Sequence, residues 1–424
     1  MHVFWLVSMV LPQAAAACEL NSASDVSGGW LTGQLCALQN RKDLQLTVAC
    51  VDGRRKTALC GTLDGVTYRI LPGPQDFPAL LQAVQPDLIH IWGTEYAAAA
   101  AMRQTADTLF IPVLVGIQGV MKHCAAHLCD GVPSSYLHST PLDRMLDRAI
   151  PGALLDKMQA NFDALAASEA ELLSNARYVT GRTSFDRRAV TELAPQARYF
   201  ACNETLRPLF YQGTEWKPRA FGRAPVLLLS QGNYPLKNLH TVLKALPALL
   251  ERWPDLQLRI AGWPPLDKGP LLRPLIARLF PYQRYCRRLA ASLGVADHIH
   301  YTGPLGAEAM RQAYLDADLF VLPSLSENSP NSLGEAMLLG VPCIASCAGG
   351  IPDMITDGQE GLLYGAPLDA DALASAITRL LCAPDGGAAL GQAARLRARQ
   401  THDPAANADT LCGIYQTIVQ EETV

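Results

Sequence analysis

The chain has 424 residues, of which 49% are hydrophobic and 17% are charged, and its formal net charge is -4. Apolar content this high with so little charge excludes a disordered chain, and the small negative charge gives no support to nucleic acid as the main partner. The length exceeds what one core usually holds, so we expect two domains of roughly 200 residues each.

The N-terminus is an apolar run that ends at Pro12. The sequence MHVFWLVSMVLPQAAAAC is similar to a signal peptide, but no Lys or Arg precedes the apolar residues, as a secretory signal normally requires. We therefore favour the first strand of an α/β domain in a cytoplasmic protein and keep export as the alternative. Gly28 and Gly29 follow this strand, where small residues let a ligand approach the backbone. No apolar stretch reaches the ~18 residues that a membrane-spanning helix needs.

Short apolar runs alternate with helical patterns through the first half of the chain. The runs predicted as strands are His2–Val10, Leu44–Val51, Val66–Leu71, Asp87–Trp92, Ile111–Ile117 and Tyr178–Gly181. The helical patterns lie near residues 30–40, 75–85, 94–106 and 183–194. This alternation predicts a mostly parallel sheet covered by helices on both faces, with ligands at the carboxyl ends of the strands.

Residues 118–156 interrupt this alternation. The segment is too long for an ordinary connection and follows a strand, which is typical of a functional region. It holds His123 and His127 beside Cys124 and Cys129. Zinc binding is one alternative for these side chains, but the chain has no C-x2-C pair, so we favour reduced and mostly buried thiols.

The second half begins at Val226, after a linker over about residues 208–225 in which prolines and a glycine interrupt any period. Its predicted strands are Val226–Ser230, Leu256–Gly262, His298–Thr302, Asp318–Leu322 and Gly361–Tyr364. Lys237 directly precedes a predicted helix. Residues 271–293 combine arginines with leucines and aromatic residues, which favours an amphipathic surface helix, with an interfacial membrane helix as the alternative.

The stretch from Leu322 to Gly361 carries the clearest chemical signal. A buried strand ends at Pro323, and a helix is expected with Ser329 as N-cap and Pro330 at its first position. The amides of Asn331, Ser332 and Leu333 then have no acceptor within the helix and lie at the positive end of its dipole. This geometry predicts an anion site, for which a phosphate is the natural ligand.

Two glutamates flank that helix start, Glu327 before it and Glu335 inside it. Eight residues separate them, which corresponds to up to roughly 12 Å along a helix. A carboxylate pair that flanks one glycosidic bond lies closer, at ~5 to 10 Å. The spacing therefore fits the two ends of an extended ligand whose hydroxyl groups the carboxylates accept.

The E-x7-E pattern of Glu327 and Glu335, in a strand, helix, strand, Gly-Gly, helix context, resembles the donor-sugar signature of family 4 retaining glycosyltransferases. This resemblance implies the GT-B fold, with two Rossmann-like α/β domains that face each other across a cleft. It implies that Glu335 binds the ribose of a nucleotide-diphospho-sugar and that Glu327 binds the transferred sugar. It also implies that Asn331, Ser332 and the turn at Gly349 and Gly350 line the donor.

The same resemblance assigns further residues. Lys237 is placed like the lysine that neutralises the donor diphosphate, and Gly28 and Gly29 like the loop that faces it. Family members often have a histidine after the strand that precedes Gln118, which leaves His123 as the candidate for a catalytic histidine. They commonly have an arginine where this chain has Gln231.

Because Gln231 is uncharged, one positive charge expected at the donor is missing. Arg182 and Arg207 are the candidates to supply it. The segment over residues 118–156 is then expected to shape the acceptor site. No cofactor is implied, and the Asp-Ala-Asp triplets at 316–318 and 369–371 are expected at helix ends and not at a metal.

The predicted organisation is an N-terminal acceptor-side domain over residues 1–210 and a C-terminal donor-binding domain over residues 222–400. A C-terminal helix at about 405–424 is expected to pack back on the first domain. The implied function is retaining transfer of a hexosyl unit to a glycan or lipid-linked acceptor in bacterial surface polysaccharide biosynthesis, with peripheral membrane contact. The alternatives are a sugar-nucleotide epimerase or hydrolase of the same fold, and a non-catalytic scaffold that binds sugar nucleotides.

Overall fold

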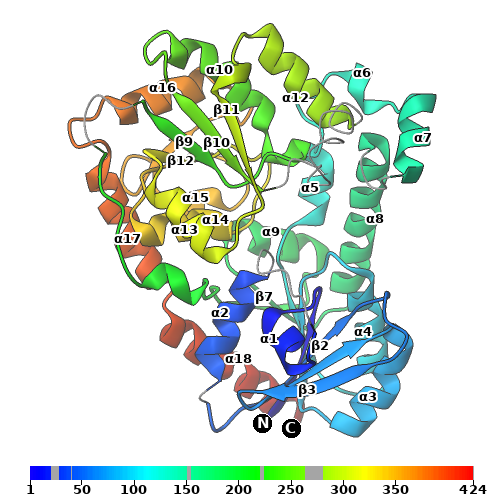
Figure 1. The fold of residues 1–424 in the computed structure, drawn as a ribbon. Coiled ribbons are helices and arrows are strands. Elements are labelled where there is room, and N and C mark those ends of the chain that lie inside the picture. The colour runs from blue at the N-terminus through cyan, green and yellow to red at the C-terminus, as the bar shows by residue number, and fades with distance from the viewer. Residues whose placement is uncertain (21–27, 40, 150–153, 220–223, 263–279, 424) are drawn as a thin grey trace. The chain divides into compact units, whose positions relative to one another are not determined.

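A computed structural model of the protein describes residues 1–20, 28–39, 41–149, 154–219, 224–262 and 280–423. The chain divides into two compact units. The first contains Met1–Met121, Ala164–Pro208 and Thr401–Val424, and the second contains Lys122–Asp163 and Leu209–Gln400. Each unit is built on one predominantly parallel sheet with helices around it, so the predicted α/β fold class is confirmed (Figure 1).

The described part of the first unit holds an eight-stranded sheet in the order β3-β4-β2-β1-β5-β6-β7-β8. Its strands are β1 His2–Val7, β2 Gln45–Val51, β3 Leu59–Leu63, β4 Val66–Leu71, β5 Leu88–Trp92, β6 Val113–Gly116, β7 Tyr178–Gly181 and β8 Arg198–Ala201. All neighbours pair in parallel except β3 and β4. The six strands predicted in this half are confirmed, although two of them end earlier and three begin later than expected.

Strands β3 and β8 were not predicted. Both lie at edges of the sheet, and both alternate or mix polar with apolar residues, so neither produces a continuous apolar run. Strand β3 turns back onto β4 through Asp64 and Gly65, whose φ angles are 50° and 78°. Two consecutive residues in the left-handed region are typical of a tight hairpin turn, which the apolar pattern alone did not indicate.

The helices of the first unit cover both faces of its sheet. They are α1 Pro12–Ala17, α2 Gly29–Leu38, α3 Phe77–Val84, α4 Ala97–Thr108, α9 Ser184–Leu193 and α18 Pro404–Thr423. The C-terminal helix α18, drawn in red in Figure 1, packs beside α2. The hydroxyl of Tyr415 on α18 lies 3.0 Å from Trp5 Nε1, which donates to it, and 2.7 Å from His90 Nδ1. The helix that the sequence placed at about 405–424 is thus part of the first unit.

The described part of the second unit holds a six-stranded sheet in the order β11-β10-β9-β12-β13-β14. Its strands are β9 Val226–Leu229, β10 Gln257–Ala261, β11 Ile299–Gly303, β12 Leu319–Leu322, β13 Cys343–Ser346 and β14 Leu362–Tyr364. Every pair of neighbours is parallel. The strands predicted in the second half are confirmed.

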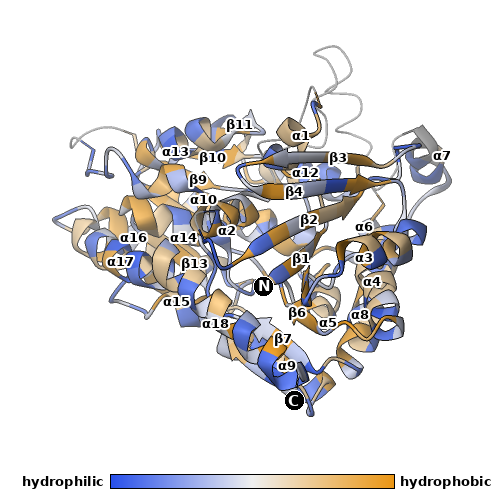
Figure 2. Ribbon diagram, turned by 90° about the horizontal axis from the view of Figure 1, so that it is seen from below, coloured by the Kyte–Doolittle hydropathy of each residue, from blue (hydrophilic) through white to orange (hydrophobic). Residues whose placement is uncertain are grey.

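Most remaining helices belong to the second unit, and the division between the units falls inside α8. They are α5 Met121–His127, α6 Ser134–Leu137, α7 Pro141–Ala149, α8 Leu155–Ser174, α10 Leu239–Leu250, α12 Pro281–Ser292, α13 Ala307–Leu315, α14 Asn331–Leu339, α15 Ile351–Met354, α16 Ala370–Leu381 and α17 Ala388–Thr401. Short 3-10 turns are η1 Pro74–Asp76, η2 Pro208–Tyr211, η3 Pro235–Lys237 and η4 Ala296–His298. Helix α16 carries apolar and polar residues side by side in Figure 2, and its apolar residues join the core of the second unit.

Residues 122–163 group with the second unit, whereas the sequence placed all of 1–210 in one domain. Polar contacts inside the second unit account for this difference. Arg284 on α12 pairs with Asp143 on α7 at 3.0 Å, and the hydroxyl of Tyr285 lies 3.4 Å from the carbonyl of Gly131. A long segment that follows a strand of one sheet can still bury its surface against another unit, and its length alone does not indicate which.

The region predicted as an amphipathic helix at 271–293 is described only from residue 280 onward, so Arg273 and Arg278 lie outside the described residues. From there, α12 buries Tyr282, Tyr285 and Cys286 in the core of the second unit, as an amphipathic helix of a globular protein does. In the described part of the chain, no helix is both long and apolar enough to cross a membrane.

Candidate functional site

The strand order of the second sheet defines where its ligand site is expected. Strand β9 comes first in the chain and lies between β10 and β12, so the direction of strand addition reverses between β9 and β12. In open α/β sheets, ligands bind outside the carboxyl ends of the strands at such a switch point. Lys237 follows β9 and Glu327 follows β12, so the two predicted site residues lie at this position.

Hydrogen bonds connect the loop after β9 to the loop after β12. Asn238 has a φ of 55° and donates from Nδ2 to the carbonyl of Pro323 at 2.9 Å. The amide of Leu325 donates to the carbonyl of Leu236 at 2.8 Å. These bonds fix the short turn that carries Lys237 against the loop that carries Glu327, although 90 residues separate the two in the chain.

The side chains of Lys237 and Glu327 form an ion pair, with Nζ and Oε1 2.6 Å apart. Their exposed fractions are 16% and 14%, so the pair is mostly shielded from water. Ser324 donates to the same carboxylate oxygen at 2.8 Å, and the ammonium group lies 5.6 Å from the ring centroid of Tyr234. The sequence predicted a role for each charge but not that the two would contact each other.

The protonation of Lys237 is set by competing effects. Burial by itself lowers the pKa of this lysine, but the nearby carboxylate of Glu327 and the phenol of Tyr234 outweigh burial and raise the pKa above the usual lysine value. Lys237 is therefore a cation throughout the physiological range. An ammonium group has three N–H donors, so it can keep Glu327 as a partner and still donate to an anion.

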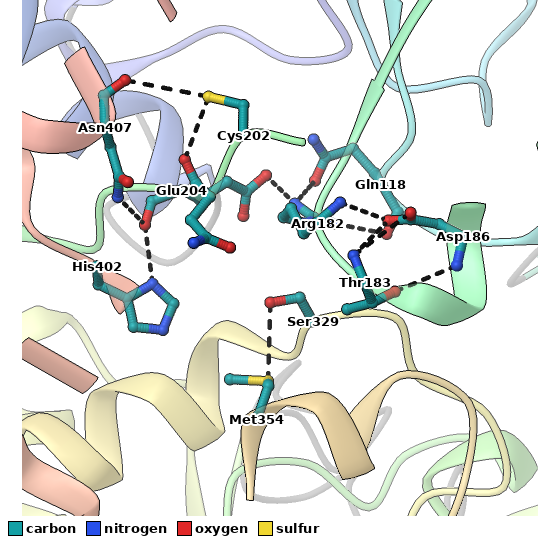
Figure 3. A network of polar contacts seen from close by, with 11 residues as sticks. Gln118, Arg182, Thr183, Asp186, Cys202, Glu204, Ser329, Met354, His402 and Asn407 are labelled. Carbon is teal, nitrogen blue, oxygen red and sulfur yellow. Dashed lines mark hydrogen bonds and ion pairs between the residues drawn. The ribbon is translucent and has the colours of Figure 1, made fainter. Parts of the chain in front are cut away.

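Helix α14 begins one residue later than the sequence predicted. Its N-cap is Pro330, with φ −68° and ψ 116°, and its first helical residue is Asn331. The hydroxyl of Ser329 does not cap the helix but donates to the sulfur of Met354 at 3.7 Å (Figure 3). The prediction of Ser329 as N-cap was wrong because the extended conformation of Pro330 places the cap at that proline.

The later start changes which amides are available to an anion. The amide of Leu333 donates to the carbonyl of Pro330 at 3.0 Å, so the prediction that this amide is open was wrong. The amide of Gly334 donates to the same carbonyl at 3.3 Å. No described residue accepts a hydrogen bond from the amides of Asn331 and Ser332, and these two remain at the positive end of the helix dipole.

The Gly-Gly turn packs directly on the backbone of Glu327. Gly349 has a φ of 56°, and a Cβ there would lie 2.0 Å from the carbonyl oxygen of Glu327. The amide of Gly350 donates to that same oxygen at 2.9 Å. Only glycine fits at position 349, and the turn consequently lies at the site with Lys237 and Glu327.

Glu335 lies in the second turn of α14 and is only 6% exposed. A glutamate on a solvated helix face would be far more exposed, so burial excludes that simple explanation. Its predicted contact with ribose hydroxyls remains a prediction.

His123 lies on α5 and approaches the same loop. Its Nδ1 is 2.7 Å from Ser326 Oγ, directly before Glu327 in the chain, and Cys124 Sγ is 3.7 Å from the same oxygen. Burial, followed by the neighbouring His127, lowers the pKa of His123, so the imidazole is neutral at pH 7. The structure thus brings His123 to the loop of the predicted sugar-binding glutamate, where it contacts a serine hydroxyl.

Most of the other predicted residues lie in the first unit. Gly28 is the N-cap of α2 with a φ of 73°. A Cβ on Gly29 would lie 2.4 Å from Cδ of Arg207, so the arginine side chain lies directly across this glycine. The predicted Gly-Gly loop and the candidate cation Arg207 are therefore neighbours within one unit. Ser27, which precedes them, lies outside the described residues.

Arg182 is at the centre of a buried polar network (Figure 3). Its guanidinium donates to Oε1 of Gln118 at 3.0 Å and to the backbone oxygen of Gln118 at 2.8 Å, and it forms an ion pair with Glu204. The exposed fractions of Arg182 and Glu204 are 5% and 4%. His402 Nδ1 lies 2.8 Å from the carbonyl of Glu204, and burial lowers the pKa of this histidine to about 4.

Part of the second unit matches a known protein family. Residues 214–397 match the family described as "Glycosyl transferases group 1". This range contains Lys237, Glu327, Glu335 and the Gly-Gly turn. Residues 214–397 form a group 1 glycosyltransferase domain.

Curated relatives match over the same part of the chain. One relative is the GDP-mannose-dependent alpha-(1-6)-phosphatidylinositol monomannoside mannosyltransferase of Mycolicibacterium smegmatis. The two sequences are 33% identical over 181 residues, and this alignment covers 41% of this chain and 43% of the relative. A second relative is the D-inositol 3-phosphate glycosyltransferase of Streptomyces griseus. The sequences are 33% identical over 169 residues, and the alignment covers 39% of this chain and 33% of the relative. The chain thus spans less than half the length of these relatives.

Solved structures match nearly the whole chain. Sucrose-phosphate synthase from Thermosynechococcus elongatus has a TM-score of 0.68 at 17% identity and covers 99% of each chain. Anabaena HepE in complex with UDP-glucose has a TM-score of 0.66 at 15% identity and covers 98% of this chain and all of that one. Identities this low show the fold alone, which is the predicted GT-B fold.

The Asp-Ala-Asp triplets have structural partners in the glycosyltransferase domain. Asp318 accepts from the amide of Val226 at 2.7 Å and pairs with Arg219 at 2.9 Å. Asp369 caps α16 by accepting from the amide of Ala372 at 2.8 Å. In the described part of the chain, no group of three or more His, Cys, Asp or Glu side chains lies close enough to hold a metal ion. The 12 cysteines, which all lie in the described residues, form no disulfide with one another.

The roles of Gln231, Arg182 and Arg207 remain predictions. Gln231 follows β9 with an exposed side chain, at the position where an arginine was expected. Whether Arg182 or Arg207 supplies the missing charge is untested, although the guanidinium of Arg182 is already paired inside the first unit.

Sequence reasoning missed two acidic residues in the first unit, Glu95 and Glu169, which both accept a hydrogen bond from Thr94. Glu95 follows β5, which lies next to β1 where the strand order of that sheet reverses. Burial raises the pKa of Glu95, and Thr94 donates to Glu169 at 2.5 Å directly beside it. A signal was present, because Gly93, Thr94 and Glu95 directly follow the predicted strand that ends at Trp92, where a parallel sheet places its ligands.

Proposed function

We propose that this chain is a retaining glycosyltransferase that moves a hexosyl unit from a nucleotide-diphospho-sugar to an acceptor hydroxyl. The observation that carries the proposal is the position of Lys237 and Glu327 as a shielded pair at the switch point of the second sheet. The open amides of Asn331 and Ser332 lie at the start of the helix that follows. The group 1 glycosyltransferase domain supports the same reaction class.

The chemical problem in this transfer is the charge that develops on the departing diphosphate. In our proposal Lys237 and the two amides of α14 donate to the diphosphate, since preorganised donors of this kind stabilise developing negative charge. Glu327 orients the transferred sugar, and Glu335 accepts from the ribose hydroxyls. No metal ion or cofactor is required in this scheme.

Retention follows in the proposal from attack on the same face as the leaving group. The bond from the anomeric carbon to the diphosphate oxygen breaks, and a bond from that carbon to the acceptor oxygen forms. The acceptor proton passes to a donor phosphate oxygen, so no side chain serves as the base. His123 is neutral and bonded to Ser326, which suits a residue that holds the loop of Glu327 in position.

The donor and acceptor classes are proposed from the relatives. One relative is named for GDP-mannose and a phosphatidylinositol mannoside, and a structural neighbour was solved with UDP-glucose. We propose a nucleotide-diphospho-hexose as donor and a glycan or lipid-linked glycan as acceptor, in bacterial surface polysaccharide biosynthesis. The enzyme would then work in the cytoplasm, with peripheral contact to the membrane that holds a lipid-linked acceptor.

A thermal-shift panel of nucleotide sugars, with GDP-mannose and UDP-glucose as its first members, tests the donor. A ligand present at 100 times its dissociation constant stabilises the protein by ~2.7 kcal/mol, which is a shift of several degrees. The Lys237→Ala variant should lose most of the shift. If no nucleotide sugar shifts the unfolding temperature of the unaltered protein, the proposal is wrong.

Product analysis separates transfer from its alternatives. Transfer predicts a new glycoside, whereas an epimerase or hydrolase yields an epimer or the free sugar. The non-catalytic alternative is favoured by one observation, that Gln118 stands where related enzymes often have a histidine and is held by Arg182. Nucleotide binding without turnover on any glycan acceptor would establish that alternative.

A further inference from the structure

A cavity of about 440 Å³ lies within the second unit and is not explained by the donor site. Three parts of this unit line it: the first turns of α8, the loop over residues 233–235 and the start of α12. The lining residues used below are Asn161, Phe162, Asn233, Tyr234, Phe280 and Gln283. Its volume falls within the ~300 to 1,000 Å³ of ordinary small-molecule sites.

The lining combines aromatic rings with carboxamides. Phe162, Tyr234 and Phe280 provide apolar faces, and Asn161 and Gln283 carry groups that both donate and accept hydrogen bonds. The described lining residues include no carboxylate. A sugar ring needs this pair of features, because its C–H faces are apolar and its hydroxyl groups are polar and uncharged.

The charge near the cavity is already neutralised. Lys157 lines the cavity, but its ammonium group forms an ion pair with Asp147, whose side chain is 3% exposed. A neutral ligand is therefore favoured over an anionic one at this place.

One polar atom of a lining residue lacks a hydrogen-bond partner among the described residues. Oδ1 of Asn233 is buried, and within the described residues no donor lies in hydrogen-bond range of it. The residue is held in place because Gln283 donates from Nε2 to its backbone carbonyl. The hydroxyl of Tyr282, another lining group, is 3.1 Å from His240 Nδ1 and so is already used. Because this oxygen is covered in the structure, a rotation of the Asn233 side chain toward the cavity would let a ligand hydroxyl supply the missing hydrogen bond.

Tyr234 links the cavity to the donor site. It lines the cavity, and its ring centroid lies 5.6 Å from Nζ of Lys237, the cation that pairs with Glu327. We propose that the cavity binds a neutral sugar unit of the acceptor. This inference rests on the transferase function proposed above. It gives residues 155–163, which begin where the segment expected to shape the acceptor site ends, a direct part in acceptor recognition by the second unit.

The test uses the full-length protein and neutral methyl glycosides of glucose, mannose and galactose, first without any nucleotide and then with UDP or GDP added. Binding is measured by saturation-transfer NMR for the unaltered chain and for Phe162→Ala and Asn161→Ala. The matched controls are Phe185→Ala, which removes a half-buried phenylalanine from α9, and Asn175→Ala, which removes an exposed asparagine just after α8. Neither control residue lines the cavity.

We expect at least one glycoside to bind, and each cavity variant to weaken its affinity by about three- to tenfold while both controls leave it unchanged. A glycoside that binds all five proteins equally, or no glycoside that binds the unaltered chain, would overturn the inference. Complete displacement of the glycoside by UDP or GDP would overturn it too, because the cavity would then belong to the donor.

The two proposals fail in different ways. Glycoside binding is measured without a nucleotide sugar, so its absence leaves the transferase proposal intact. Absence of every nucleotide-sugar shift refutes the transferase while the glycoside measurement still reports what the cavity binds.

Discussion

The ion pair between Lys237 and Glu327 allows the strongest quantitative prediction. Its atoms are 2.6 Å apart with exposed fractions of 16% and 14%. At an effective dielectric constant of ~20, the attraction between two unit charges at this distance is about 6 kcal/mol, most of which the loss of hydration offsets. Removal of one partner leaves the other charge buried and unpaired, so Lys237→Met and Glu327→Gln should each lower the free energy of unfolding by roughly 3 to 5 kcal/mol.

The double variant distinguishes an energetic pair from two independent residues. If the two charges stabilise each other, the combined loss is smaller than the sum of the single losses, by roughly 2 to 4 kcal/mol. Urea unfolding followed by circular dichroism measures these free energies, with separate transitions fitted for the two units where they occur. The controls are Lys244→Met on α10 and Glu251→Gln at its C-terminal end, both exposed and each expected to change stability by less than ~0.5 kcal/mol.

Additive single losses, within ~0.5 kcal/mol, would refute this reasoning. The close contact between the two side chains would then have no energetic weight, and the shielded pair would no longer support a preorganised charge at the donor site. Losses in the two controls as large as those in the site variants would refute it as well, because shielding would then have no special effect.

Three further predictions concern the same protein. The Lys237→Ala variant should lose roughly two to three orders of magnitude in turnover, since removal of one well-placed donor costs ~3 to 4 kcal/mol in other enzymes, and unchanged turnover would exclude this lysine from the mechanism. Gly349→Ala should weaken donor binding more than tenfold because its Cβ would displace the backbone of Glu327, whereas Gly386→Ala, with a similar φ of 61° and its nearest neighbour 3.6 Å away, should leave binding unchanged in calorimetry. The pKa of His402 is about 4 in the folded protein and 6.5 in the unfolded chain. Its contribution of ~3 kcal/mol to the free energy of unfolding is therefore complete above pH 6.5 and is lost as the pH falls toward 4. Acid unfolding of His402→Gln should accordingly show a shallower loss of stability over that range, and an unchanged slope would contradict the assignment.

The sequence predicted the sheets well because buried parallel strands are continuous apolar runs. Strands β9, β12 and β7 came within a residue of their predicted ends, and the edge strands β3 and β8 were missed because half-exposed residues break such a run. The helix starts were less certain. Ser329 and Pro330 both fit cap preferences, and only the backbone angles of Pro330 decided between them.

The candidate site was predicted residue by residue but not as an arrangement. The spacing of Glu327 and Glu335, the lysine before α10 and the two glycines at 349 and 350 are local patterns that the chain itself displays. Local patterns do not report which side chains face each other. That Lys237 contacts Glu327, or that Gly349 packs on its carbonyl, depends on the order of strands in the sheet.

The sequence by itself determined the α/β class, the family-like donor motif and the helix start that favours an anion, because periodicity, caps and short spacings are properties of contiguous residues. Only the tertiary structure decided that residues 122–163 belong with the second unit and that Arg182 is enclosed with Gln118 and Glu204. It also decided that an aromatic and amide-lined cavity lies next to Tyr234. The physical reason is that these features arise from packing between segments far apart in the chain, where burial and charge pairing are set by neighbours that no local pattern encodes.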